Sequence, residues 1–214
     1  MSRISDLYKK YKIMPNLELH MLRVASVAKI ICANLIDPLS KEDEDNIVKS
    51  LLLHDFGNIV KADFSVFPKE FYDPEGIDFW RDVQQQFVQK YGENDHEANK
   101  KIAEEMEVSK KVIDFIDVLE FSSLCRNLES GSLPIQILVY SDLRVGPYGV
   151  LSYEERMDEA NKRYQHPEQE ERQKLVSCGK KIEEIVFKNS KIKPNDINDQ
   201  SILPVLEELK EFVI

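Results

Sequence analysis

The sequence predicts an all-α protein, and two observations lead to that prediction. Seven glycines in 214 residues are too few for a sheet-rich protein with many tight turns. Apolar residues recur at three- and four-residue steps almost from end to end, which is typical of amphipathic helices. We therefore expect a bundle of about eight or nine helices. Their ranges are expected at about 16–36, 43–56, 77–90, 95–106, 109–128, 133–145, 152–165, 168–189 and 201–212.

The ends of these helices carry recognisable stop signals. The first helix has a regular apolar stripe and should end at Asp37-Pro38, while Gly57 suits the position just past the second helix. Gly146-Pro147 should end the helix that begins near residue 133, and residues 190–200 should form a loop before the last helix. The stripe of the first helix comprises Leu17, Met21, Val24, Ala28 and Ile31.

Composition limits the size and the partners of the protein. A chain of 214 residues with 42% hydrophobic residues suits one domain over 1–214. The net charge is −10 and no run of Lys and Arg alternates with aromatics, so long nucleic acid is not an expected partner. No stretch is long enough to span a membrane, and the start lacks an apolar signal core.

The three cysteines are odd in number and widely spaced along the chain. Cys32, Cys125 and Cys178 are interpreted as reduced thiols, as is usual in a cytosolic protein. We therefore expect a cytoplasmic protein.

His54 and Asp55 stand side by side at the end of an apolar run of leucines. An ionised carboxylate in such surroundings costs several kcal/mol unless it is hydrogen-bonded, neutralised or bound to a cation. A metal ion is the simplest compensation. The alternative is a buried histidine that hydrogen-bonds neighbouring backbone.

Two further polar residues are predicted to face the core. His20 lies three residues after Leu17 and four before Val24, on the apolar stripe of the first helix. Asp142 shares a helical face with Leu138 and other apolar residues. Each alone has an ordinary structural explanation, but together with His54-Asp55 they favour a metal site.

The order His20, His54-Asp55 and Asp142, each on a predicted helix, resembles the HD superfamily of metal-dependent phosphohydrolases. The local segments around Asp55 and Asp142 are also similar to that superfamily, and the resemblance covers about residues 16–145. Helices over 152–214 are expected to pack on this motif-bearing part. The HD-GYP phosphodiesterases usually have Lys where this chain has Asn58, and they carry further histidines, so membership of that group is disfavoured.

The resemblance implies a metal centre with His20, His54, Asp55 and Asp142 as ligands. Imidazoles with carboxylates suit Mn²⁺, Fe²⁺, Co²⁺, Ni²⁺ or Zn²⁺ better than Mg²⁺. Open coordination positions would accept water and a phosphoryl oxygen, so that activated water attacks phosphorus. Asp55 is expected to take part in catalysis and to bridge to a second metal if two ions bind.

His96 is expected near a helix start, because Asn94 and Glu97 have the spacing of a capping box. It is either an exposed residue beside a cap or a group that binds substrate phosphate or a second metal.

Arg144 is the second candidate phosphate contact, because its guanidinium can bind phosphate through two parallel hydrogen bonds. Its alternative role is an ion pair with Asp142 or Glu154. Lys61 is a weaker candidate of the same kind.

The segment 63–76 carries four aromatic residues and no regular periodicity. It is expected to be a loop packed over the core, with a lid or a base-stacking surface as the alternative. His166 is expected in a surface loop.

These observations predict a cytoplasmic metal-dependent phosphohydrolase, a phosphomonoesterase or phosphodiesterase acting on a small phosphorylated molecule such as a nucleotide. A diiron oxygenase occurs on this scaffold but needs more histidine ligands than four histidines readily supply. The other alternative is a catalytically silent HD module that binds a nucleotide as a regulatory sensor.

Overall fold

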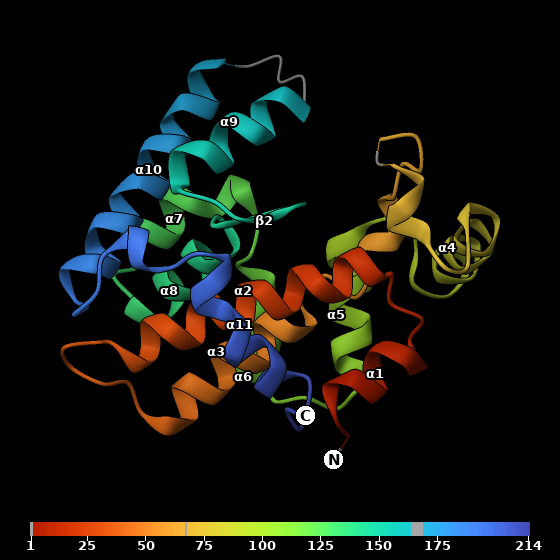
Figure 1. The fold of residues 1–214 in the computed structure, drawn as a ribbon, viewed down its shortest axis with the longest axis horizontal. Helices are drawn as coiled ribbons and strands as arrows, with labels where there is room; N and C mark the ends of the chain where they lie inside the picture. The colour runs from red at the N-terminus through yellow and green to blue at the C-terminus, as the bar shows by residue number, and fades with distance from the viewer. Residues whose placement is uncertain (1, 67, 164–168) are drawn as a thin grey trace.

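The computed structural model describes residues 2–66, 68–163 and 169–214. It confirms the all-α prediction, since helices make up most of the chain and the described strands form only a small hairpin of Val145–Gly146 (β1) and Gly149–Val150 (β2) (Figure 1). The described α-helices are α1 (Ile4–Lys10), α2 (Pro15–Ala33), α3 (Lys41–Leu53), α4 (Ile77–Tyr91), α5 (Asp95–Glu105), α6 (Lys110–Asp117), α7 (Leu124–Glu129), α8 (Leu133–Asp142), α9 (Tyr153–Arg163), α10 (Gln169–Lys188) and α11 (Asp199–Leu209).

Three of these helices, α1, α6 and α7, differ from the sequence prediction in more than their end residues. The seven-residue α1 was not predicted, and it is held by burial of Ile4, Leu7 and Tyr8, because a helix this short is marginal on its own. The single helix expected over 109–128 is divided into α6, a 3-10 helix η3 (Phe121–Ser123) and α7. At the break the side-chain amide of Asn127 donates to the Val118 carbonyl at 2.9 Å and so satisfies the end of α6.

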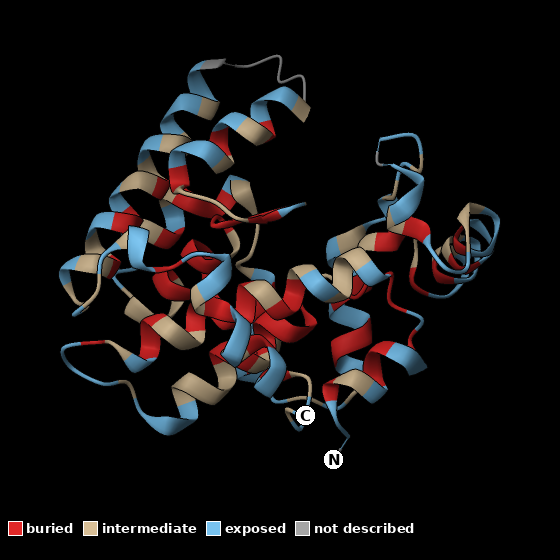
Figure 2. Cartoon of the chain, in the orientation of Figure 1, coloured by how far each residue is buried: buried red, intermediate tan, exposed pale blue. Residues whose placement is uncertain are grey.

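Helix α2 lies at the centre of the fold and packs against α3, α8 and α11. Figure 2 shows buried residues gathered along these helices, whereas exposed residues cover the outer faces of α4 and α10. Burial on α2 extends beyond the predicted stripe to Leu22, Ala25 and Val27, because helices contact it from several sides. The centre of α2 is therefore largely removed from solvent.

The C-terminal helices pack on the motif-bearing part of the chain. Helix α10 contacts α7 and α8, and α11 lies along α2. The two ends of the chain meet, since the Ile4 amide donates to the Phe212 carbonyl at 2.8 Å and the Ile214 amide to the Ser2 carbonyl at 3.0 Å. None of the described helices combines the length and the apolar character needed to cross a membrane.

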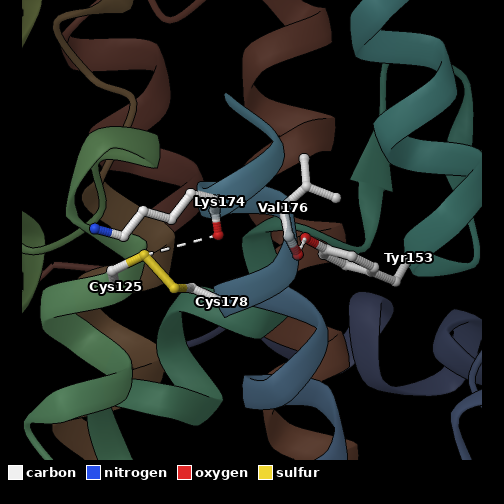
Figure 3. Close-up of a disulfide and its surroundings, with 5 residues drawn as sticks. All are labelled: Cys125, Tyr153, Lys174, Val176 and Cys178. Atoms are coloured by element: carbon white, nitrogen blue, oxygen red, sulfur yellow. Dashed lines mark hydrogen bonds between the residues drawn. A yellow bond between two sulfur atoms is a disulfide. The ribbon is translucent and has the colours of Figure 1, made fainter. Parts of the chain in front are cut away.

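The prediction of three reduced cysteines is wrong for two of them. Cys125 on α7 and Cys178 on α10 form a disulfide across the packed helices, with their Cα atoms 5.1 Å apart (Figure 3). Spacing along the chain could not reveal this pairing, because 53 residues separate the two cysteines. Cys32 is free and buried, and burial raises the pKa of its thiol to about 12. The cysteines therefore do not support a cytoplasmic location, because two of the three are paired.

Close packing of α9 on α10 occurs beside this disulfide. The Tyr153 hydroxyl donates to the Val176 carbonyl at 2.7 Å, as Figure 3 shows. A Cβ atom at Gly179 would overlap that hydroxyl, so only glycine allows this approach.

Candidate metal centre

The structure brings the four predicted ligands together from three mutually packed helices. His20 lies within α2, His54 follows the last residue of α3, and Asp142 is the last residue of α8. His20 Nε2 is 3.2 Å and His54 Nε2 is 3.5 Å from Asp142 Oδ1. One ligand atom from each of these three residues lies within 4.8 Å of the other two, so the group could hold one metal ion.

Asp55 adjoins this group and presents one oxygen to each imidazole. Its Oδ2 lies 3.6 Å from His20 Nε2, and its Oδ1 lies 3.6 Å from His54 Nε2. Each Asp55 oxygen is therefore close to a different imidazole. This arrangement suits a carboxylate that binds one ion while its second oxygen remains available.

The hydrogen bonding of His54 is the strongest indication that a metal ion binds at this centre. The Nδ1–H of His54 donates to the Leu51 carbonyl at 2.8 Å, which leaves Nε2 facing the centre as the nitrogen that can give up its proton to bind a metal. Nε2 is buried and makes no well-formed hydrogen bond among the described residues, although it lies at ion-pair distance from Asp142 Oδ1 (3.5 Å) and Asp55 Oδ1 (3.6 Å). A buried polar atom without a partner is unfavourable, and a metal ion at this position would satisfy it. The residues present therefore fit a metal ion.

The charges at this centre are strongly coupled. Burial alone would lower the pKa of His54, but the negative charges of Asp55 and Asp142 raise it to about 9. Burial alone would raise the pKa of Asp142, but hydrogen bonding and attraction from His20 and His54 hold it well below its usual range. In the absence of a metal, an imidazolium compensates the carboxylates.

Metal binding at pH 7.5 should therefore release a proton. With a pKa of about 9, His54 is protonated in the metal-free protein, whereas only a neutral imidazole nitrogen binds metal. Affinity for metal should rise with pH up to that value. Calorimetric titration with Mn²⁺ in buffers of different ionisation enthalpy should report about one proton per ion. Equal heats in all buffers would contradict this assignment.

The centre opens onto a pocket with a volume of about 840 Å³, a size that accommodates a small organic phosphate. Its walls come from several elements besides those that carry the ligands. The 3-10 helices η1 (Asn58–Lys61) and η2 (Lys69–Tyr72) contribute to it, together with the start of α5, η3 and α9.

The absence of a side chain at Gly57 allows α5 to pack close to the segment that follows Asp55. A Cβ at Gly57 would lie 2.7 Å from the Ala98 Cβ, so any side chain there would force α5 away. The Gly57 amide also donates to the Asn99 side-chain oxygen. The segment after Asp55 and the N-terminal half of α5 are thus held in direct contact.

His96 lies on the pocket wall in the first turn of α5. The predicted cap is present, since the Asn94 side chain accepts a hydrogen bond from the Glu97 amide at 2.9 Å. His96 Nδ1 is 3.6 Å from Glu120 Oε1, and Lys61 pairs with Asp95 on the same wall. The positions of His96 and Lys61 are compatible with contact to a substrate.

The structure does not place Arg144 in the pocket. Its side chain is 2% exposed, and it donates to the Tyr140 hydroxyl at 2.7 Å and to the Pro194 and Ile197 carbonyls. A further hydrogen bond goes to the Leu151 carbonyl. The prediction that Arg144 grips phosphate is therefore corrected, because its donors already bind protein acceptors. The alternative ion pair with Asp142 or Glu154 is not seen among the described residues either.

Two arginines that the sequence did not single out line the pocket instead. Arg156 and Arg163 lie on α9, and both bind Glu159. The only signal for them was their position on a charged helix, where charged residues usually face solvent. Only the tertiary structure, which places Arg156 and Arg163 at the pocket, distinguishes them from surface residues.

The segment 63–76 borders the pocket through Asp63, Val66, Phe71 and Tyr72. Tyr72 is buried, and its ring meets Phe64 edge-on at 5.4 Å, so part of the segment packs on the core as predicted. Whether it acts as a lid stays a prediction. His166 lies outside the described residues.

Comparison with protein-family models, curated proteins and solved structures finds no match for this chain.

Proposed function

We propose that this chain is an HD-type metal-dependent phosphohydrolase that acts on a small phosphorylated molecule. The observation that supports this most strongly is the convergence of His20, buried His54 and Asp142, in which His54 Nε2 makes no well-formed hydrogen bond to the protein. Two imidazoles with carboxylates favour a first-row transition metal over an alkaline earth ion. His20, His54, Asp55 and Asp142 would hold one or two such ions.

The charge of the pocket supports a role for a cation. Its described lining includes five carboxylates against three Lys or Arg residues and the His54 imidazolium, so a metal ion would add positive charge that favours a phosphate. The carboxylates are Asp55, Asp63, Asp95, Glu120 and Asp142, and the cations are Lys61, Arg156 and Arg163.

Three residues at the pocket have specific roles in this proposal. When bound, a divalent ion lowers the pKa of water and polarises a phosphoryl oxygen. Asp55 would hold the ion and would use its carboxylate to accept a hydrogen bond from the attacking water and so orient it. His96, at the positive end of α5, and Arg156 on α9, which both line the pocket, bind the phosphoryl group.

The metal-loaded protein should hydrolyse a soluble phosphate ester, and EDTA should abolish the activity. Duplex DNA and RNA should be poor substrates, since the net charge of −10 repels long polyanions. A panel of phosphomonoesters, nucleotides and cyclic nucleotides, assayed with Mn²⁺, Fe²⁺, Co²⁺, Ni²⁺ and Zn²⁺ in turn, checks this expectation. Tight binding of a nucleotide without turnover under any metal would favour the silent sensor module instead.

A further inference from the structure

Two aromatic side chains from separate elements of the pocket wall are in contact. Phe71 of η2 lines the main pocket, and Tyr148 directly follows Pro147, which lines it from the turn of the β1–β2 hairpin. The rings of Phe71 and Tyr148 meet edge-on, with their centres 5.6 Å apart. In Figure 1 the tip of the hairpin is directed toward the segment that carries η2. The pair, called here the aromatic bridge, therefore joins two parts of the pocket wall.

The aromatic bridge lies on the solvent side of the pocket. Tyr148 is 69% exposed, whereas His54 at the metal centre is 5% exposed. Phe71 is intermediate between them and itself lines the pocket. Over this part of the pocket the two rings thus stand between solvent and the metal centre.

Each side of the aromatic bridge is anchored separately. At the base of the hairpin the Val145 carbonyl accepts a hydrogen bond from Arg156 Nε at 2.9 Å. On the other side the indole N–H of Trp80 donates to the Tyr72 carbonyl at 3.1 Å. Parting the rings breaks neither hydrogen bond. An aromatic pair favours contact over separation by roughly 2- to 10-fold, so the bridge is closed most of the time and still opens readily.

We infer that the aromatic bridge sets the size of the substrate. This rests on the proposed function, because the phosphoryl group would bind at the metal centre. A small ester enters when the rings part and fits in the pocket of about 840 Å³ with the rings closed. A long chain attached to the ester would have to pass between the rings and hold them apart, so such a ligand is disfavoured. The substrate class is accordingly a free small phosphate ester rather than the phosphorylated end of a polymer.

Two chromogenic esters test the effect on hydrolysis. 4-Nitrophenyl phosphate is compared with an analogue whose ring carries a long uncharged oligo(ethylene glycol) chain, so that charge does not distinguish them. Tyr148→Ala should raise kcat/KM for the chain-bearing ester relative to the small one by about fivefold, because the ring contact is lost. Tyr148→Phe keeps the ring and should match wild type. Phe79→Ala is the matched control, since Phe79 is an exposed aromatic residue outside the described pocket lining.

Thiol labelling tests the aromatic bridge without any hydrolysis. Asn58 lines the pocket beside buried Asn99, and Asn58→Cys places a thiol there. Iodoacetamide should label this thiol at similar rates with and without Tyr148→Ala. A maleimide on a long polyethylene glycol chain should react about fivefold faster when Tyr148→Ala is present. The free Cys32 is buried with a pKa of about 12, so it should contribute little background.

The outcomes distinguish this inference from the proposed function. If 4-nitrophenyl phosphate is hydrolysed but Tyr148→Ala leaves the ratio between the two esters unchanged, the aromatic bridge does not select by size and the function stands. If no ester is hydrolysed with any metal, the proposed function fails and the substrate assignment fails with it, while labelling still decides whether the bridge restricts access. A labelling ratio unchanged by Tyr148→Ala would overturn the bridge in either case.

Discussion

Asp142→Asn should abolish stable metal binding while the protein remains folded. The substitution keeps the shape of the side chain but removes the negative charge that lies 3.2 Å from His20 Nε2 and 3.5 Å from His54 Nε2. Loss of a group that merely supports a ligand weakens metal binding by about 10–100-fold, so loss of a direct ligand should exceed that range. Elemental analysis and the rise in melting temperature on adding Mn²⁺ or Zn²⁺ measure the effect, because a ligand that binds the native state stabilises it.

Asp63→Asn is the matched control for this experiment. Asp63 lines the same pocket, but its carboxylate accepts hydrogen bonds from Ser65 and lies outside the ligand group. This variant should retain the full metal content and the full thermal shift. Equal metal binding by Asp142→Asn and wild type would remove Asp142 from the site, even if activity were lost.

Arg144→Met should lower the free energy of unfolding by about 3 kcal/mol or more, since each buried acceptor that loses its donor costs about 1–3 kcal/mol. Methionine fills a similar volume but donates no hydrogen bond. The Leu151, Pro194 and Ile197 carbonyls would each lose a donor, and so would the Tyr140 hydroxyl, which itself donates to Glu183 at 2.7 Å. Urea denaturation measures the loss.

The exposed Arg81→Met is the control, since Arg81 pairs only locally with Asp78 on α4, and the expected change is below about 0.5 kcal/mol. Metal content per folded molecule should be unchanged in Arg144→Met. Normal stability combined with weakened phosphate binding would restore the role first predicted for Arg144.

The sequence was sufficient for the parts of the fold and site that depend on local pattern. The apolar stripe of α2 placed His20 toward the core, and Asp142 near the end of its helix faces the same centre. The Asn94 cap also agrees with the prediction, whereas α3 ends at Leu53, so Gly57 directly precedes the next 3-10 helix rather than ending α3 as predicted. Periodicity and capping depend on residues that are close in sequence, so they can be predicted without the tertiary structure.

The parts that could not be predicted depend on contacts between distant segments. Arg144 is two residues from Asp142, yet its side chain is directed to carbonyls around residues 194–197, about which the local sequence says nothing. The Cys125–Cys178 disulfide and the arrival of Arg172 beside Phe121 both depend on how α10 packs. Asn127 breaks the helix predicted over 109–128 by binding a carbonyl nine residues earlier.

Crystals of the protein grown with Mn²⁺ would test the metal centre most directly, through anomalous diffraction. The proposal predicts an anomalous peak among His20 Nε2, His54 Nε2 and the carboxylates of Asp55 and Asp142, with the His54 Nδ1 hydrogen bond to Leu51 retained. Mn²⁺ bound elsewhere, or no peak at this centre in crystals at neutral pH, would contradict it.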